Sequence, residues 1–376
     1  MEAYQDFLLL VDGKEAFPSI LSEINQAKKD IHINMFIWRD DHIGNEIGKA
    51  CLEAANRGVK VYISIDRYGV VLEKSEESKK SFFHKKQSII EKIKIQALKL
   101  FYPMKGSSKD TKDLESELYK QIMNHPNIIV SNNIFKADHS KFYIIDDEIL
   151  FLGGINIEDK ENGADMQGRT YQDYMVKITG TSHVSAFKTK IEKGIDISKD
   201  YSFGINSKEI SPCFFEMEDI YLDMINKCKS NLQITMAYFS PLKKFTKAII
   251  DAYKRGVKIT ILIPSMANYQ NDTNRKTIKK LMKKTNDGIE VYFSPKMVHT
   301  KLMIADDLIS FGSTNITKKA FKQLNELNLC LKKKDCPFIS HLLNSITENY
   351  QLSKEIKNHK EIKYNPFMAF IEGFLV

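Results

Sequence analysis

Apolar residues along the chain alternate between runs with the period of a helix and runs typical of a buried strand. "AANRGVKVYISID", which ends at Asp66, and "DAYKRGVKITILIP", which ends at Pro264, show the change most plainly. Each pattern predicts a helix closed by a glycine, Gly58 or Gly256, and followed at once by a strand of β-branched residues. Strands that alternate with helices in this way predict an α/β fold with a buried sheet.

The same features occur twice, in the same order. "AKKDIHINMFIW" from Ala27 matches "CKSNLQITMAYF" from Cys228, and the two glycine-closed segments follow. "HSKFYIID" from His139 then matches "HTKLMIAD" from His299, and the small-residue turns "LGGIN" and "FGSTN" come after them. Four matched features in one order predict a duplication. We therefore expect two similar α/β/α sandwich halves, residues 1–200 and 201–376.

The two halves differ in the spacing that precedes the histidine-containing segment. Gly58 and His139 are 81 positions apart whereas Gly256 and His299 are 43 apart, so the first half carries about 38 extra residues, within residues 70–127. Apolar residues at helical spacing there are Phe82, Phe83, Ile90, Ile93, Ala97, Leu100 and Phe101, with seven lysines in the span Lys79–Lys99. This pattern predicts a basic amphipathic helix. It would lie on an anionic membrane, cover the mouth of a site, or pack its apolar stripe on the core.

Composition is that of a globular protein. The chain has 376 residues, 43% of them hydrophobic and 28% charged, which is enough for two domains of ordinary size. The five cysteines are scattered and lack Cys-x-x-Cys spacing, so we expect reduced thiols and no zinc site. The sequence shows neither a signal peptide pattern nor an early apolar run of about 18 residues. It therefore predicts a cytoplasmic protein without transmembrane helices.

The net charge of +8 comes from 56 basic and 48 acidic residues, and only six of the basic residues are arginines. A lysine ammonium is a hydrated point charge that suits a diffuse anionic surface better than bidentate recognition of bases. Membrane headgroups and nucleic acid are both open as partners, and so is a solvated basic surface with no special partner.

The repeated His-x-Lys pairs suggest chemistry on a phosphoryl group. Side chains two apart on a strand share a face, so His139 projects with Lys141 and His299 with Lys301. The lysine beside each histidine would repel a divalent cation, and the sequence predicts neither a metal nor a cofactor. Lysine can neutralise phosphoryl oxygens while histidine attacks phosphorus or protonates the leaving oxygen.

Asp146 and Asp306 close the two repeated segments. Each lies an odd number of positions beyond its histidine, where the strand should turn, so the aspartates need not face the reaction. We expect them to support the site, by holding the turn or a nearby cation.

With these motifs the sequence resembles the phospholipase D superfamily over almost its whole length outside the insertion. The resemblance implies two halves related by a pseudo-twofold axis, with a single active site at their interface. It also implies a covalent phosphohistidine on one histidine, with the other acting as general acid and then base. His139 is the expected nucleophile and His299 the expected acid.

The resemblance assigns further roles by position. Lys141 and Lys301 would bind phosphoryl oxygens, with Asn156 and Asn315 beside them. Asp173 in "TYQDYMVKITG" and Glu326 in "QLNELNLCL" would orient the histidines, because such chemistry needs an orienting group. The residues expected to contact the substrate are Gly154, Ser313 and Tyr238.

Within the superfamily the sequence is most similar to bacterial cardiolipin synthases, through "AYFSP", "GGINIEDK" and "GSTNITKKAF". It departs from them in lacking paired amino-terminal membrane helices, in carrying the basic insertion, and in placing Lys318 and Lys319 where an arginine is usual. The tail "YNPFMAFIEGFLV" could insert at an interface or dock on the core.

These features predict a phosphatidyltransferase that joins two phosphatidylglycerol molecules and releases glycerol. Its partners would be anionic phospholipid and the inner face of the cell membrane, bound peripherally. The alternatives are a phospholipase D-type hydrolase and a phosphodiesterase acting on nucleic acid. The complete set of His, Lys, Asn and acidic positions argues against an inactive scaffold.

Overall fold

The computed structural model describes residues 4–76, 80–101, 115–198 and 200–375. The chain forms two compact units, one of residues Asp6–Lys188 and the other of Thr189–Val376 together with Met1–Gln5. Each unit contains one large mixed sheet with helices on both faces. The α/β class and the two similar halves predicted from the sequence are confirmed.

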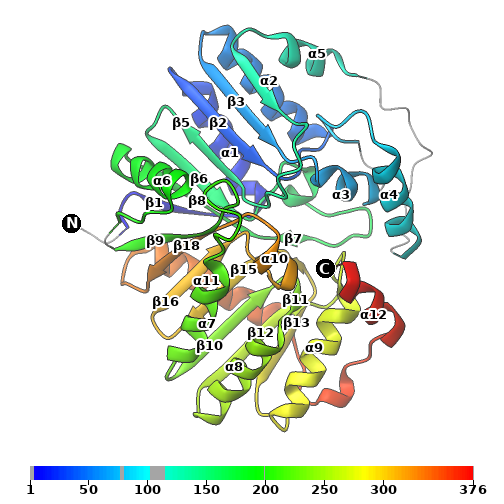
Figure 1. The fold of residues 1–376 in the computed structure, drawn as a ribbon. Helices are drawn as coiled ribbons and strands as arrows, with labels where there is room; N and C mark the ends of the chain where they lie inside the picture. Colours follow the sequence, from blue (N-terminus) through cyan, green and yellow to red (C-terminus); the bar gives the residue numbers. More distant parts are fainter. Residues whose placement is uncertain (1–3, 77–79, 102–114, 199, 376) are drawn as a thin grey trace. The chain divides into compact units, whose positions relative to one another are not determined.

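The sheet of the first unit has seven strands in the order β1-β8-β6-β5-β2-β3-β4 (Figure 1). β2, β3 and β4 run parallel, and the other neighbours are antiparallel. The strands are β1 (Phe7–Val11), β2 (Asp30–Met35), β3 (Lys60–Ile65), β4 (Ile128–Ser131), β5 (Phe142–Ile145), β6 (Ile149–Gly153) and β8 (Tyr174–Thr179), and the short β7 (Tyr171–Gln172) precedes β8.

The sheet of the second unit repeats this order as β9-β18-β16-β15-β10-β12-β13 and adds β19 at one edge. Its strands are β9 (Tyr201–Asn206), β10 (Asn231–Met236), β12 (Lys258–Pro264), β13 (Glu290–Ser294), β15 (Lys301–Ala305), β16 (Leu308–Gly312), β18 (Glu326–Lys332) and β19 (Lys354–Glu355). Smaller strands are β11 (Phe239–Ser240), which pairs with β17 (Ile316–Thr317), and β14 (Met297–Val298). Strand by strand, both the order and the directions match the first unit.

Helices cover both faces of the first sheet. α1 (Asp12–Gln26), α2 (His42–Asn56) and α5 (Glu117–Asn124) pack their apolar sides into one core with Tyr143 and Ile145 of β5. The neighbouring residue Phe142 points to the opposite face, where its ring centroid lies 5.1 Å from that of Phe187 in α6 (Thr181–Lys193). A short 3-10 helix, η1 (Asp159–Asn162), follows β6.

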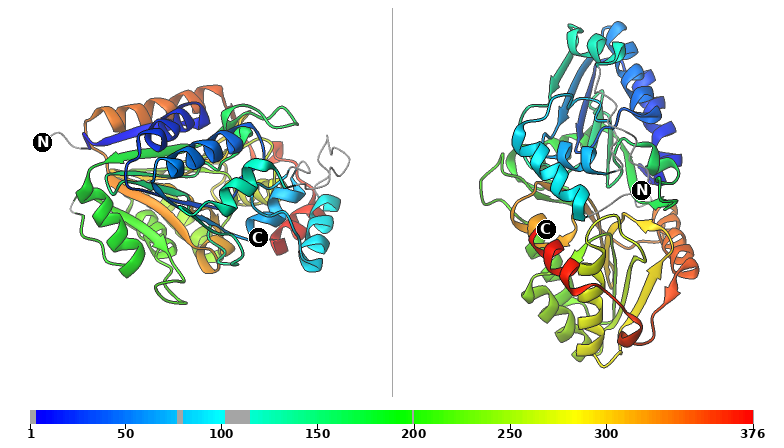
Figure 2. Two further views of the ribbon diagram at one scale, coloured as in Figure 1. Left: turned by 90° about the horizontal axis from the view of Figure 1, so that it is seen from above. Right: turned by 90° about the vertical axis from the view of Figure 1, so that its right-hand side faces the viewer.

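The second unit has the same layers. α7 (Met217–Lys227), α8 (Lys243–Lys254) and α9 (Asn271–Lys284) share one core, and α11 (Pro337–Leu352) covers the other face. α10 (Lys318–Lys322) and η2 (His359–Glu361) are short. α12 (Pro366–Leu375) lies beside α9 (Figure 2), where Glu372 accepts a hydrogen bond from the backbone N–H of Thr273. The carboxy-terminal tail therefore docks on the core, yet Phe367 and Phe370 remain exposed.

Two glycines end matching helices. Gly58 follows α2 with φ of +97° and Gly256 follows α8 with φ of +88°. A side chain at either position would meet no neighbouring atom, so the left-handed backbone conformation, and not crowding, calls for glycine. The closing glycines predicted from the sequence are confirmed.

Tyr4 belongs structurally to the second unit although it lies near the start of the chain. Its ring centroid is 6.2 Å from that of Phe338 in α11. Its hydroxyl lies 3.1 Å from the carbonyl oxygen of Asp200 and accepts a hydrogen bond of 3.2 Å from the N–H of Lys332. A discontinuous segment thus completes the edge of the second unit.

The insertion forms α3 (Gly69–Ser75), α4 (Ile89–Phe101) and α5, and residues 77–79 and 102–114, with Lys79, lie outside the described part. The prediction of one helix from Phe82 is wrong at its start, since α4 begins at Ile89. Phe82 and Phe83 precede it and are buried in the core against Trp38. Their aromatic side chains are part of the core of the first unit. Helical spacing of apolar residues alone cannot distinguish such a segment from the apolar side of a helix.

Among the described residues, α4 is attached to the rest of the first unit along one side. Ile95 packs on Val70 and Val71 of α3, and the carboxylate of Glu91 pairs with Arg67 at 3.0 Å. The opposite side carries four apolar residues that are 64–77% exposed: Ile89, Ile90, Ile93 and Leu100. Of the three arrangements predicted for this helix, packing of the apolar stripe on the core is wrong, because the helix docks by its other side and the stripe is exposed.

One carboxylate in each unit holds the turn after the motif strand. Asp146 accepts hydrogen bonds from the backbone N–H groups of Lys28, Lys29 and Asp30, at 2.7–3.2 Å. Asp306 accepts the equivalent bonds from residues 229–231 at 2.7–2.9 Å. Both aspartates have positive φ, 55° and 54°, which Asp tolerates better than most residues. They lie at the far end of β5 and β15 from the motif histidines, which gives them a structural role.

We predict that Asp306 stabilises the fold less as the pH falls. Burial alone would raise the pKa of Asp306, but the three backbone N–H groups outweigh it and lower the pKa. A lowered pKa means stabilisation that is present above the ordinary pKa and is lost as the pH falls through the lowered value. Asp306→Asn should therefore cost about 1 kcal/mol at pH 7 and progressively less below about pH 4.

The measurement is the urea midpoint of unfolding as a function of pH, with the exposed neighbour substituted in Asp307→Asn as the matched control. A deficit in Asp306→Asn that stays constant with pH, or that the control shares, would contradict the assignment.

Candidate active site

Each motif histidine lies a few residues before a strand near the centre of its sheet. His139 and His299 precede β5 and β15, whereas the sequence placed them within the strands. Both histidines are buried, and the two motif lysines are completely buried. In both units the lysine ammonium donates to the carbonyl oxygen of the histidine two residues earlier, and Lys301 Nζ lies 2.9 Å from His299 Nδ1. The repeated spacing therefore produces the same buried cation beside each histidine.

An aromatic ring lies against each histidine. The ring of Phe36 is edge-on to that of His139, with centroids 4.9 Å apart, and Lys141 Nζ is 5.2 Å from the same ring. Tyr238 stands 6.2 Å from His299, and its hydroxyl donates to Asn268 at 2.6 Å. Sequence reasoning found Tyr238 but missed Phe36, because the aromatic residue occupies adjacent, non-equivalent positions in "NMFIW" and "TMAYF".

The two predicted acidic residues occupy equivalent positions. Gly153 pairs with Met175 and Gly312 with Asn328, so Asp173 and Glu326 each stand two residues before the partner of a motif glycine. Both carboxylates are buried next to the small-residue turn. The sequence predicted this equivalence, and the strand register supplies it.

The residue that faces each acid differs between the units. A Cβ atom added to Gly154 would come within 2.2 Å of the Asp173 carboxylate, so no larger residue fits there without movement. Ser313 takes the corresponding place in the second unit, and its hydroxyl donates to Glu326. Gly is thus paired with Asp, and Ser with Glu.

The two motif asparagines also differ. The side-chain oxygen of Asn315 accepts from the backbone N–H of Tyr238 at 3.3 Å. Asn156 is 3% exposed, and its side-chain oxygen has no hydrogen-bond partner among the residues the structure describes. Buried polar groups are normally satisfied, so this oxygen is an exception within the part of the chain that the structure describes.

Polar residues that the sequence did not reveal hold the segment before His139. Asp138 accepts from the Ser140 N–H at 3.0 Å and from the Asn34 side chain at 3.1 Å. Its own N–H donates to Asp66 at the end of β3. The second unit has apolar Val298 in place of Asp138, so comparison of the repeats gave no signal.

A buried cluster of charges fixes the turn that carries Asn156. Arg39 is fully buried and pairs with Glu158 at 3.0 Å and with Glu76 at 3.1 Å. Lys160 reaches the same two carboxylates at 3.2 and 2.6 Å. Burial would lower the pKa of Arg39, but the surrounding glutamates, Glu158 foremost, raise it, so Arg39 stays charged.

This cluster joins three segments that are distant in sequence: the loop that follows β2, the residue after α3, and the residues that follow Asn156. In the second unit Ser240 and Thr317 take the places of Arg39 and Glu158, and pair through their backbones in β11 and β17. Within the described residues no group of three or more His, Cys, Asp or Glu side chains is arranged to hold a metal. Across the same residues, no helix combines the length and hydrophobicity that crossing a bilayer requires.

Comparison with known proteins places the chain in a family. Residues 20–194 and 221–350 match the family model described as "Cardiolipin synthase, PLD-like domain". The chain belongs to this phospholipase D-like family. The protein is therefore an enzyme, a phosphatidyltransferase of the cardiolipin synthase type.

Curated relatives are similar along most of the chain. The Minor cardiolipin synthase ClsB of Bacillus subtilis is 24% identical over 93% of this chain and 82% of its own length. A cardiolipin synthase of Clostridium perfringens is 26% identical over 86% of this chain, which spans 66% of that relative. A cardiolipin synthase of Listeria monocytogenes is 24% identical over 93% of this chain and 70% of its own length.

Solved structures share the fold. Phosphatidylserine synthase of Haemophilus influenzae aligns with a TM-score of 0.71 at 13% identity, covering 99% of this chain and 92% of its own. Polyphosphate kinase of Porphyromonas gingivalis aligns with a TM-score of 0.55 at 12% identity, over 98% of this chain and 52% of its own. At these identities the likeness concerns the fold alone.

We predict that Gly154→Ala disables the enzyme without unfolding it. The added methyl would displace the Asp173 carboxylate, and a displacement of about 1 Å costs on the order of 100-fold in rate. Phospholipid turnover should fall accordingly, while circular dichroism stays unchanged. Gly163→Ala is the matched control, because a Cβ there would meet nothing within 4 Å.

The double variant Gly154→Ser with Asp173→Glu recreates the pair found in the second unit. It should be more active than Gly154→Ser alone if the contact between turn and acid matters. Equal activities of the single and double variants would refute this reading.

Proposed function

We propose that the protein transfers a phosphatidyl group from one phosphatidylglycerol to the hydroxyl of a second, releasing glycerol, and that His139 and His299 act in the same reaction. The observation that carries the proposal is the repeated buried pair, in which a lysine ammonium is folded against each motif histidine. A fixed buried cation is what a phosphoryl group with developing negative charge requires, and it needs little reorganisation when the charge appears.

In the first step His139 attacks phosphorus as the bond from phosphorus to the glycerol oxygen breaks. His299, as imidazolium, gives its proton to that oxygen, so glycerol leaves neutral and a phosphatidyl-histidine remains. Lys141 and Lys301 neutralise the non-bridging oxygens. Asp173 and Glu326 orient the imidazoles, as positioning residues.

In the second step a glycerol hydroxyl of another phosphatidylglycerol attacks phosphorus. His299 takes the hydroxyl proton, the bond between phosphorus and nitrogen breaks, and His139 is free again. Water in place of the hydroxyl would give phosphatidic acid. Transfer thus depends on a lipid hydroxyl reaching the intermediate before water does.

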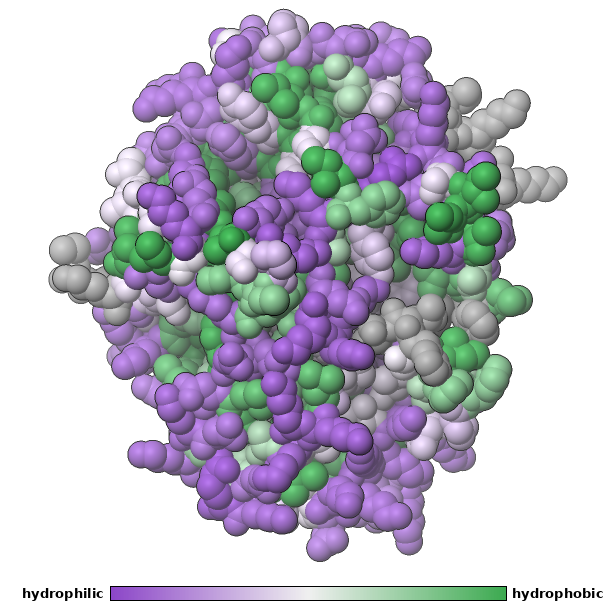
Figure 3. Space-filling view, in the orientation of Figure 1, coloured by the Kyte–Doolittle hydropathy of each residue, from purple (hydrophilic) through white to green (hydrophobic). Residues whose placement is uncertain are grey.

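We propose further that α4 attaches the enzyme to the membrane surface. Its exposed apolar stripe, which Figure 3 shows as a hydrophobic area, is flanked by the exposed Lys92 and Lys94. Its other side is fixed to α3, so the outward orientation of the stripe is built into the fold. An apolar stripe bordered by lysines is typical of helices that lie in the headgroup region.

Lys85 differs from the lysines of α4. It is buried and pairs with Asp40 at 3.0 Å, so it holds the insertion in place. A test of membrane attachment must leave it unchanged.

We predict that His139→Ala and His299→Ala each lower turnover by about 10³-fold or more, because both steps use both histidines. The assay is mass spectrometry of products from phosphatidylglycerol in detergent micelles. Cardiolipin with glycerol indicates transfer and phosphatidic acid indicates hydrolysis, whereas cleavage of added DNA without lipid products would favour a nuclease.

The order of the steps can be tested with a soluble phosphodiester that has a good leaving group. His299→Ala should accumulate an adduct on His139, detectable by peptide mapping at high pH. An adduct found on His299 in the reciprocal variant would reverse the two roles.

We predict that Ile89→Ser with Ile93→Ser weakens sedimentation with anionic vesicles by about tenfold, because two exposed apolar side chains no longer enter the interface. The matched control is Ile129→Ser with Ile134→Ser, two isoleucines of the same unit that are 58% and 54% exposed. Micellar turnover should be kept by both variants. Equal loss of vesicle binding in the control would rule out a specific role for α4.

A further inference from the structure

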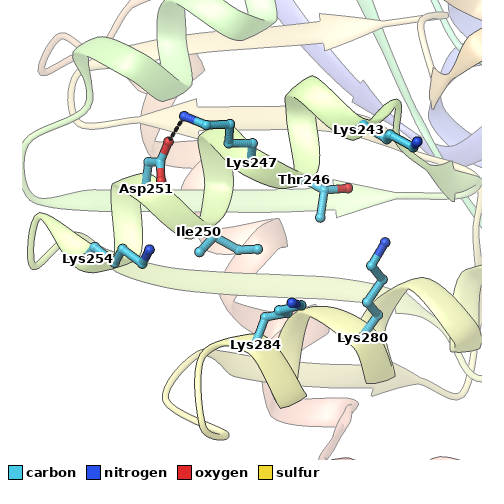
Figure 4. A pocket seen from close by; sticks show the side chains of 8 residues that line it. All are labelled: Lys243, Thr246, Lys247, Ile250, Asp251, Lys254, Lys280 and Lys284. Carbon is cyan, nitrogen blue, oxygen red and sulfur yellow. Dashed lines mark hydrogen bonds and ion pairs between the residues drawn. The ribbon is translucent and has the colours of Figure 1, made fainter.

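A groove of about 430 Å³ lies between α8 and α9 of the second unit, and lysines line both of its sides (Figure 4). Lys243, Lys247 and Lys254 come from α8, and Lys280 and Lys284 from α9. Thr246 and Ile250 also line it. Both helices turn their apolar sides into the core, so the lysines are not needed for packing.

The positive charge of the groove is largely uncompensated. Asp251 is the one acidic residue of the lining, and it pairs with Lys247 at 2.7 Å. For Lys243, Lys254, Lys280 and Lys284, no carboxylate of the described residues lies within ion-pair distance. The four lysines are exposed, so solvent screens their mutual repulsion, and an anion bound between them would lower it further.

The duplicated fold does not require this charge. The matching helix of the first unit, α2, carries Glu46, Lys49 and Glu53 and is slightly acidic. α8 carries four lysines against the one aspartate. A feature confined to one of two otherwise similar halves points to a purpose beyond the shared architecture.

We propose that the α8–α9 groove binds the phosphate headgroup of an anionic phospholipid in the bilayer, at a site distinct from the motif residues. This rests on the proposed function, since the lipids of that reaction are anionic. Lysine ammonium groups attract lipid phosphates as point charges, and each contributes favourably near an anionic surface.

Two observations favour lipid over nucleic acid. The lining contains no aromatic residue on which a base could stack. Beside α9, α12 exposes Phe367 and Phe370, which are 67% and 60% exposed and suited to the interfacial region of a membrane. The groove and these side chains thus occupy neighbouring helices of one unit.

The test compares two fourfold variants with the same change of charge. The groove variant replaces Lys243, Lys254, Lys280 and Lys284 with Gln. The control variant replaces Lys332, Lys333, Lys357 and Lys360, which are exposed elsewhere in the same unit. Circular dichroism confirms that both fold.

Sedimentation is measured with vesicles of phosphatidylglycerol in phosphatidylcholine and with phosphatidylcholine alone. The groove variant should bind the anionic vesicles about tenfold more weakly at 0.1 M salt, and the control less than about twofold more weakly. Neither should change binding to phosphatidylcholine. Equal losses in the two variants would mean that only net charge matters and would overturn the proposal.

Two further arms identify the ligand. Inorganic phosphate, compared with chloride at equal ionic strength, should not displace the protein from anionic vesicles; specific displacement would make free phosphate the ligand. Gel shifts with DNA test the other source of phosphate. Loss of DNA binding in the groove variant, with vesicle binding intact, would assign the groove to nucleic acid.

Micellar turnover of phosphatidylglycerol separates this proposal from the proposed function. If the wild type forms cardiolipin and the two variants bind vesicles equally, the proposed function is supported and the proposal for the groove is contradicted. If only the groove variant loses vesicle binding and the wild type forms no cardiolipin, the proposal for the groove is supported and the proposed function is contradicted.

Discussion

The hydrogen bonds that converge on the motif aspartates determine where each histidine can be. In each unit one carboxylate accepts hydrogen bonds from three successive backbone N–H groups, at the first residue of the neighbouring strand, β2 or β10, and at the two residues before it. The aspartate's own N–H returns a bond to a carbonyl of the same segment. This reciprocal contact fixes the register of the motif strand at the centre of the sheet. The histidine lies near the other end of this strand, only a few residues away, so the same contact constrains its position.

Much of this arrangement could be predicted from local sequence. Gly58 and Gly256, the division into two similar α/β halves and the equivalence of Asp173 with Glu326 all follow from patterns that the two repeats share. The prediction failed where a residue's environment comes from distant segments. Helical spacing placed Phe82 with Ile90, although one is in the core and the other in solvent. Apolar periodicity identifies a stripe but does not show which way it faces.

Buried charges were missed for a related reason. Arg39 pairs with Glu158, 119 positions away in the sequence, and with Glu76, 37 positions away. No local sequence pattern around these residues predicts either pair. Lys85 is one of the seven lysines that predicted a basic amphipathic helix, yet it is buried and pairs with Asp40. Comparison of the repeats could not help, since the second unit uses Ser240 and Thr317 where the first has Arg39 and Glu158. The halves share one backbone arrangement but differ at these positions, where the first unit has buried ion pairs and the second has the backbone pairing of β11 with β17.

The position of Tyr4 has a consequence for dissecting the protein. The second unit is assembled from two pieces of chain separated by the whole of the first, and the shorter piece contributes a buried aromatic side chain and hydrogen bonds to β18. A fragment produced by cutting within α6 would carry the second sheet without this residue and would leave part of α11 uncovered. If activity is to be recovered by mixing separately produced fragments, residues 1–5 should therefore be joined to the carboxy-terminal fragment. No single cleavage of the chain separates the two units completely.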